Sequence, residues 1–435
     1  MLEKSLRLFL ALALTSVFSL AVWAQAPQKN YKDRAEYDLY SSILKEANPT
    51  QKLALLNQWK EKYPQTDFKE ERMQLFLDTY RALNQGAKVL ETAKEMVAAD
   101  PKSASGLLWI NLMTVAMGDT SPAALDTGEQ GAKSLLANLD TIFAPEKKPA
   151  TLSEDQWKKE RNNIETIANT TLGWVAWQRK MLPDAETEFK KVLTLDPTKA
   201  QVSYWLGTVI LSQRNPDTQA QALYHFARAA NYEGPNGLDA ATRKQIQAYL
   251  EKVYTNYHGD KTGLDEIIAR AKTEPMPPAD FKVKNSAEIA AEKEEEFKKT
   301  NPMLALWMSI KKELAGPNGP AYFDEKVKDA LIPSGALGVE AFKGTVISQT
   351  PATRPKEVVV GIADAKTPEV TLKFETPLPG KAEPGTVIEF EGTPKTFTPD
   401  PFNVTFEVEK EKLKGWPTPP PAKKSGAKKG ATKKK

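Results

Sequence analysis

The sequence predicts a mainly α-helical protein, an α-solenoid of about six helix pairs followed by a helical linker and a small all-β barrel. Three observations lead to this fold class. Apolar residues recur at three- and four-residue steps as far as about residue 272, which is typical of amphipathic helices. Within that region a helix-pair pattern returns at a fixed spacing, most clearly from Gly173 to Gly207. From Phe342 onwards the apolar period becomes two, which indicates short strands.

Residues 1–24 have the features of a secretory signal. Lys4 and Arg7 precede an apolar run from Leu8 to Ala24, whose end offers small residues where a signal peptidase cuts. We therefore expect cleavage after Ala24 and export from a bacterial cytoplasm, to the periplasm or beyond the cell. The alternative is an uncleaved membrane anchor, because about 17 apolar residues are close to the shortest length that spans a bilayer.

One stretch, from Thr171 to Pro197, shows the helix pair most clearly. Pro183 suits the first turn of its second helix, and the final proline cannot continue that helix. Gly207 repeats Gly173 at an interval of 34, and the apolar spacing of the next helix recurs after a three-residue insertion. A weaker copy that ends at Pro101 lacks the glycine. Two short helices cannot bury their apolar faces alone, so the pairs are expected to stack.

These motifs resemble the tetratricopeptide repeat (TPR), a 34-residue helix pair. The residues that carry the resemblance are Gly173, Ala185, Phe189, Pro197, Gly207, Ala222 and Phe226. The resemblance implies that the glycines and alanines lie where two helices cross closely, and that the phenylalanines are core wedges. The whole chain is similar to exported bacterial TPR proteins of unassigned function that carry a C-terminal OB-like β-domain. The alternative is a set of unrelated amphipathic helices.

Further helix pairs and the domain limits follow from the same patterns. We expect TPR-like repeats over residues 25–272 and a linker with a helical segment over 273–335, where an apolar stripe begins at Met303. The other expected pairs are 31–47 with 51–62, 103–117 with 122–141, and 236–257 with 261–272.

A β-domain is expected over residues 336–416. Five short strands are predicted, at 342–348, 357–363, 369–375, 385–392 and 402–409, with the prolines between them. This number of strands suits a barrel or a sandwich, and the pattern resembles bacterial OB-like domains. The alternation places the aromatic residues in the core and a mostly acidic row, which includes Glu369, on the outer face. An acidic face repels phosphate, so no specific nucleic-acid partner is expected.

The composition argues against catalysis and metal binding by this chain. There is no cysteine, and the two histidines, His225 and His258, are well separated in the sequence. His225 is expected to pack or to lie at the surface, and His258 to be exposed. No nucleophile elbow, phosphate-binding loop or zinc signature is present. We therefore expect no catalytic residues, no metal, no cofactor and no enzymatic activity.

The TPR resemblance implies a scaffold of the cell envelope that binds a peptide or protein partner in a concave groove. First-helix positions line that groove in the family. In this sequence they are Thr170, Trp174, Trp177, Gln178, Tyr204, Thr208 and Leu211. These side chains either contact a partner or pack against the neighbouring repeat. The sequence does not indicate the oligomeric state.

An alternative function rests on residues 417–435, a Pro/Lys-rich tail that we expect to be disordered. The formal net charge is +4, but the tail from Lys423 carries +7 and residues 1–24 carry +1, which leaves about −4 for residues 25–422. A basic tail on a mildly acidic body is expected to attract anionic envelope polymers. The protein would then be a surface binder that acts through this tail and the β-domain.

Overall fold

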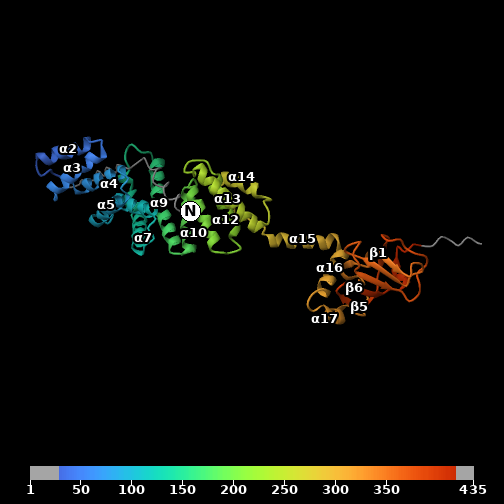
Figure 1. Cartoon of the computed structure of the whole chain (residues 1–435). Helices are drawn as coiled ribbons and strands as arrows, with labels where there is room; N and C mark the ends of the chain where they lie inside the picture. The colour runs from blue at the N-terminus through green and yellow to red at the C-terminus, as the bar shows by residue number, and fades with distance from the viewer. Residues whose placement is uncertain (1–28, 418–435) are drawn as a thin grey trace, which may run out of the picture. The chain divides into compact units, whose positions relative to one another are not determined.

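A computed structural model describes residues 29–417. The predicted signal at 1–24 and the lysines of the tail therefore lie outside the described residues. The chain divides between Asn285 and Ser286 into two compact units, each with its own core (Figure 1). The predicted fold class is confirmed: a TPR-like α-solenoid is followed by a domain built on a seven-stranded sheet.

The first unit contains six helix pairs in its described part. Five of the second helices pack against their own first helix and also contact the first helix of the next pair, whereas the last one packs against the second helix of the preceding pair. The pairs are α2 (Arg34–Lys45) with α3 (Pro49–Lys62), α4 (Lys69–Ala82) with α5 (Gly86–Ala99), α6 (Ala104–Met117) with α7 (Pro122–Ala137), α9 (Glu154–Gln178) with α10 (Leu182–Leu195), α11 (Ala200–Ser212) with α12 (Gln219–Asn231), and α13 (Ala240–His258) with α14 (Leu264–Thr273).

The backbone repeats with the predicted period. A residue in the left-handed conformation follows the first helix of four consecutive pairs, within two residues of its end: Asn84, Gly118, Lys180 and Arg214. The first two are separated by one repeat period (84 to 118), and so are the last two (180 to 214). Between the second and third the separation is 62 (118 to 180), which is one period and 28 extra residues. The third and fourth pairs are therefore separated by an insertion.

The insertion packs together with residues of the neighbouring helices into a small core. It contains α8 (Leu139–Ile142) and a 3₁₀ turn at Pro145–Lys147, and it lengthens α9 to 25 residues. Trp157 near the start of α9 packs on Phe143, with ring centroids 4.7 Å apart, and donates its indole N–H to the Phe143 carbonyl oxygen at 3.3 Å. Ser153 and Gln156 form a capping box that fixes where α9 begins.

The second unit begins with three helices, α15 (Ser286–Thr300), α16 (Pro302–Leu314) and α17 (Gly319–Tyr322). The strand order of its sheet is β5-β6-β3-β2-β1-β4-β7, with β3 parallel to β6 and the other pairs antiparallel. The strands are β1 (Phe342–Thr350), β2 (Glu357–Gly361), β3 (Val370–Lys373), β4 (Val387–Phe390), β5 (Thr393–Pro399), β6 (Phe402–Glu407) and β7 (Leu413–Lys414).

Two strands differ from the sequence prediction. The prediction places Pro394 and Pro399 between strands, but both lie in β5, which is an edge strand paired with β6. Proline cannot donate a ladder hydrogen bond, so it is tolerated at a sheet edge and beside a bulge. A register shift lies beside Pro394, whose carbonyl oxygen accepts the Asp329 backbone N–H at 3.0 Å. The short β7 is also missing from the prediction.

The segment expected as a linker over 273–335 is divided between the two cores. Phe281 and Val283 pack against the core of the solenoid. Trp307, Ile310 and Leu314 of α16 belong to the core of the sheet domain, where Trp307 lies 5.6 Å from Phe342 between ring centroids. The apolar stripe of α16 explains this difference, because a helix with such a face has to bury it. None of the helices among residues 29–417 is long and apolar enough to cross a membrane.

Candidate functional site

Two close helix crossings lie at the glycines that the repeat pattern marks. A Cβ atom added at Gly173 would lie 2.6 Å from the Phe189 ring, and one at Gly207 would lie 2.9 Å from the Phe226 ring. Such distances leave no room for a side chain. Ala185 and Ala222 are fully buried on the second helices of the same pairs. The Pro197 carbonyl oxygen accepts a hydrogen bond from Arg228 at 3.1 Å, so the end of α10 is tied to α12.

In the third pair the small residue at the helix crossing lies on the second helix, not on the first. Asn111 precedes Gly207 by the same interval that separates Gly118 from Arg214 (111 to 207, 118 to 214), so it occupies the glycine position of this pair. The close approach is provided instead by Gly131 of α7, where a Cβ atom would lie 2.7 Å from Ile110. The repeat pattern of the sequence does not reveal this exchange, because the 28-residue insertion after the third pair breaks the register.

Two of the seven expected groove residues are buried. Trp174 is 5% exposed and belongs to the solenoid core, and Thr170 donates its hydroxyl to the Thr166 carbonyl oxygen at 2.7 Å. Helix periodicity places Ile164 and Ile167 on the buried face and the tryptophans on the opposite face, but both isoleucines are only half-buried. Because α9 packs against α6, α7 and α10, most of its circumference is covered. Packing against neighbours is thus the role of Trp174.

The other five residues remain half-buried on two neighbouring first helices. Trp177 and Gln178 lie at the end of α9, and Tyr204, Thr208 and Leu211 lie along α11. The Trp177 ring lies 6.3 Å from Trp205 of α11, which brings the end of α9 next to α11. We call these five residues the first-helix face: Trp177, Gln178, Tyr204, Thr208 and Leu211. None of them is charged.

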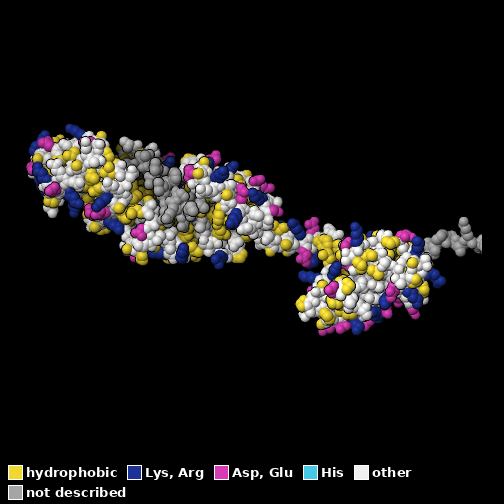
Figure 2. Space-filling view, viewed as in Figure 1, with side chains coloured by type: hydrophobic (Ala, Val, Ile, Leu, Met, Phe, Trp, Pro, Cys, Tyr) yellow, Lys and Arg dark blue, Asp and Glu magenta, His cyan; other side chains and the backbone are white. Residues whose placement is uncertain are grey.

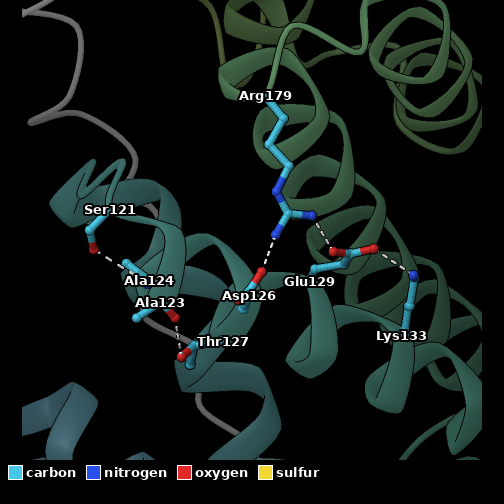
Figure 3. Close-up of polar contacts among 8 residues, drawn as sticks. All are labelled: Ser121, Ala123, Ala124, Asp126, Thr127, Glu129, Lys133 and Arg179. Carbon is cyan, nitrogen blue, oxygen red and sulfur yellow. Dashed lines mark hydrogen bonds and ion pairs between the residues drawn. The ribbon is translucent and has the colours of Figure 1, made fainter.

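An ion-pair network follows this face along the chain and reaches α7 (Figure 3). The guanidinium of Arg179, the residue after Gln178, pairs with both Asp126 and Glu129 of α7. Glu129 also pairs with Lys133 at 2.5 Å, and the hydrogen bonds from Lys133 and then Arg179 hold the pKa of Glu129 below its usual value. The network joins the third pair to the fourth across the insertion. Two positive and two negative charges balance in it.

Three buried cationic or titratable side chains serve the packing of the repeats. Arg72 donates to the Tyr63 carbonyl oxygen at 2.6 Å, and Arg228 donates to the Lys272 carbonyl oxygen at 2.6 Å, so each satisfies the end of a helix. His225 is fully buried, and neither of its ring nitrogens has a hydrogen-bond partner among the described residues. Burial first, and then the nearby Lys190 charge, lower the pKa of His225 to about 3.

His258 is less exposed than expected. Its Nδ1 lies 2.9 Å from the Lys284 carbonyl oxygen, and its Nε2 lies 3.6 Å from Asp260. Among residues 29–417 there is no group of three or more His, Asp or Glu side chains that could hold a metal ion. The hollow beside α15 is lined by residues of that helix alone. It is therefore not an enclosed ligand site.

The outer face of the sheet is less acidic than the alternation indicates. Glu369 is expected on this face, but it is 1% exposed. Its carboxylate accepts the backbone N–H groups of Ile362 at 2.7 Å and Ala363 at 2.6 Å, and pairs with Lys311 of α16. This network satisfies a buried carboxylate and fastens α16 to the sheet. On the surface Lys373 pairs with Glu357 at 3.2 Å.

Comparison with known proteins finds similarity among solved structures. No family model and no curated protein matches the sequence. Among solved structures, the chain is similar to a thermophilic TPR protein of Thermus thermophilus, at 16% sequence identity. The similarity covers 51% of this chain and 95% of that protein, with a TM-score of 0.28.

Proposed function

We propose that the solenoid is a non-enzymatic scaffold that binds a peptide or protein segment on the first-helix face. The observation that carries this proposal is that Trp177, Tyr204 and Leu211 stay partly open to solvent, although the helices that bear them are otherwise packed. Large, partly exposed aromatic side chains are the residues that most often anchor protein interfaces. Stacked repeats present such positions on neighbouring helices, so an extended segment can contact several of them.

Buried tryptophan side chains support the first-helix face and hold its open side chains in place. Trp174 lies one helical turn before Trp177 and packs into the core, and Trp205 packs at 5.8 Å on the Phe189 ring. The open side chains therefore rest on fixed ones, which reduces the entropy lost when a partner binds. The first-helix face carries no charge, and the neighbouring Arg179 network is neutral. A segment with apolar or aromatic anchors suits this surface better than a strongly charged one.

We propose export to the bacterial envelope and an OB-like barrel for the second unit. Support for export comes from the sequence of residues 1–24. Support for the barrel comes from the strand pairing. Only Glu391 and Gly392 separate β4 from β5, and β4 pairs with β1 whereas β5 pairs with β6. Taken as one bent strand, they close the order β1-β2-β3-β6 into a ring of five.

Site-specific photo-crosslinking tests the proposed surface. We would place a photoreactive phenylalanine analogue at Gln178 or Thr208 of the exported protein, and at exposed Thr187 of α10 as the control. The expected result is a crosslinked species at positions 178 and 208 that is absent at 187 and is lost when Trp177 and Tyr204 are both changed to alanine. Equal crosslinking at 187, or crosslinks that survive the double substitution, would exclude the first-helix face.

A further inference from the structure

One helix of the chain has no core beneath it. Every other described helix of ten or more residues has at least two buried residues, whereas α15 has none. The side chains packed on the solenoid core end at Val283, and those packed on the core of the sheet domain begin at Met303. Charged side chains stand out along α15 in Figure 2, with hydrophobic ones between them. Tertiary packing therefore contributes little to this helix.

Local interactions in α15 both favour and oppose the helix. Lys298 pairs with Glu294 at 2.8 Å and with Glu295 at 3.4 Å, and lysines near the C-terminal end suit the helix dipole. In the other direction, Glu288, Glu292 and Glu296 follow one another at four-residue steps, and like charges at this spacing destabilise a helix. Helices of about 15 residues or fewer are marginal in water without tertiary support.

We propose that α15 is a helical spacer that opens reversibly to coil, and that it is the first place where a protease cuts the folded chain. Fifteen residues span about 22 Å as a helix and up to about 50 Å when extended. Opening therefore lengthens the connection between the two cores while each core stays folded. This inference does not depend on what the solenoid binds.

Limited proteolysis of the exported chain with a glutamyl endopeptidase tests the proposal, with the cuts mapped by mass spectrometry. The first cuts are expected after Glu292 and after Glu294–Glu296, releasing two fragments that resist further digestion. Exposed Glu91 and Glu95 in α5, a helix packed on both neighbours, are the internal reference. First cuts after those reference residues, or equal resistance of α15 and α5, would overturn the proposal.

A pair of variants separates helix opening from simple surface exposure. Ala290→Gly with Ala291→Gly weakens α15, and Ala248→Gly changes an exposed position in the middle of α13 as the control. Because cleavage follows the open population when opening is fast, the double variant is expected to be cut on the order of tenfold faster. The melting temperatures of the solenoid and of the sheet domain should not change. The Ala248→Gly control should leave cleavage in α15 unchanged. An unchanged cleavage rate in the double variant contradicts a helix–coil spacer.

Discussion

Gly173 and Phe189 occupy the same small volume of the fourth helix pair: a Cβ atom on the glycine would lie 2.6 Å from two atoms of the ring. The relationship returns one repeat later in the approach of Gly207 to Phe226, at 2.9 Å. In each pair one helix omits its side chain so that the other can place a phenylalanine at the crossing. These two crossings therefore recur with the period of the repeat.

We expect Gly173→Ala to destabilise the solenoid by roughly 1–3 kcal/mol, because the added methyl group overpacks a filled crossing. At an exposed helix position the same change stabilises by up to about 1 kcal/mol. Gly86→Ala at the start of α5 is the matched control, since its nearest neighbour would be 3.9 Å from the new Cβ atom. Denaturant unfolding measures both. Adding Phe189→Leu to Gly173→Ala should recover part of the loss; equal stability of the Gly173 and Gly86 variants would refute the crossing.

Trp174 and Trp177 are one helical turn apart, yet we expect their alanine variants to behave differently. Trp174 is buried, and its removal should cost roughly 3–5 kcal/mol in the free energy of unfolding. Trp177 is half-buried, so its removal should cost clearly less while abolishing the crosslink at position 178. Thermal unfolding by circular dichroism separates the two. If Trp177→Ala is as destabilising as Trp174→Ala, Trp177 is a packing residue and not an anchor.

We expect the buried His225 to make the stability of the fifth pair depend on pH. Its pKa is lowered to about 3 in the folded chain, from 6.5 for an ordinary histidine. The unfolded chain therefore binds more protons between these values, and the stability should fall as the pH decreases from about 6.5 towards 3. The largest slope from one such group is about 1.4 kcal/mol per pH unit.

Replacing His225 with leucine should remove that part of the pH dependence. Carboxylates also titrate in this range, so the informative quantity is the difference between the variant and the original chain in urea unfolding from pH 4 to pH 7. Both ring nitrogens lack partners within the described part of the chain, so no hydrogen bond is lost there in the variant. Identical pH profiles for the two proteins would mean that His225 is not buried in solution.

The sequence predicts those parts of the fold that depend only on the spacing of residues along the chain. Regular spacing indicates the helix pairs and the crossing at Gly173. The repeat spacing does not identify Gly131 as a crossing residue, because an insertion shifts the register. Residue type alone does not show which helix of a pair has the small residue at the crossing. Proline is expected to break a strand, which is true of a central strand and not of the edge position that Pro394 occupies in β5.

The candidate site was harder to predict for a tertiary reason. Helix periodicity divides a helix into one buried and one open face, but α9 contacts three other helices, so Trp174 on the expected open face is buried. Only the end of α9 and one side of α11 leave large side chains of the expected groove partly open. The sequence named those residues through the TPR resemblance, and the number of packed neighbours then decided which of them remain available.

The tail supplies the last test, although Lys423–Lys435 lies outside the described residues. Seven lysines in this segment should bind anionic polymers without sequence preference, because the attraction comes from charge and counterion release. With single-stranded nucleic acid as the probe, log affinity should fall with log salt by about 0.7 for each phosphate neutralised. Deleting 423–435 should abolish binding at low salt and leave both melting transitions in place. Since residues 25–422 carry a net charge of about −4, retained binding with an unchanged salt slope would exclude the tail and move the anion site to a local basic surface of the folded body.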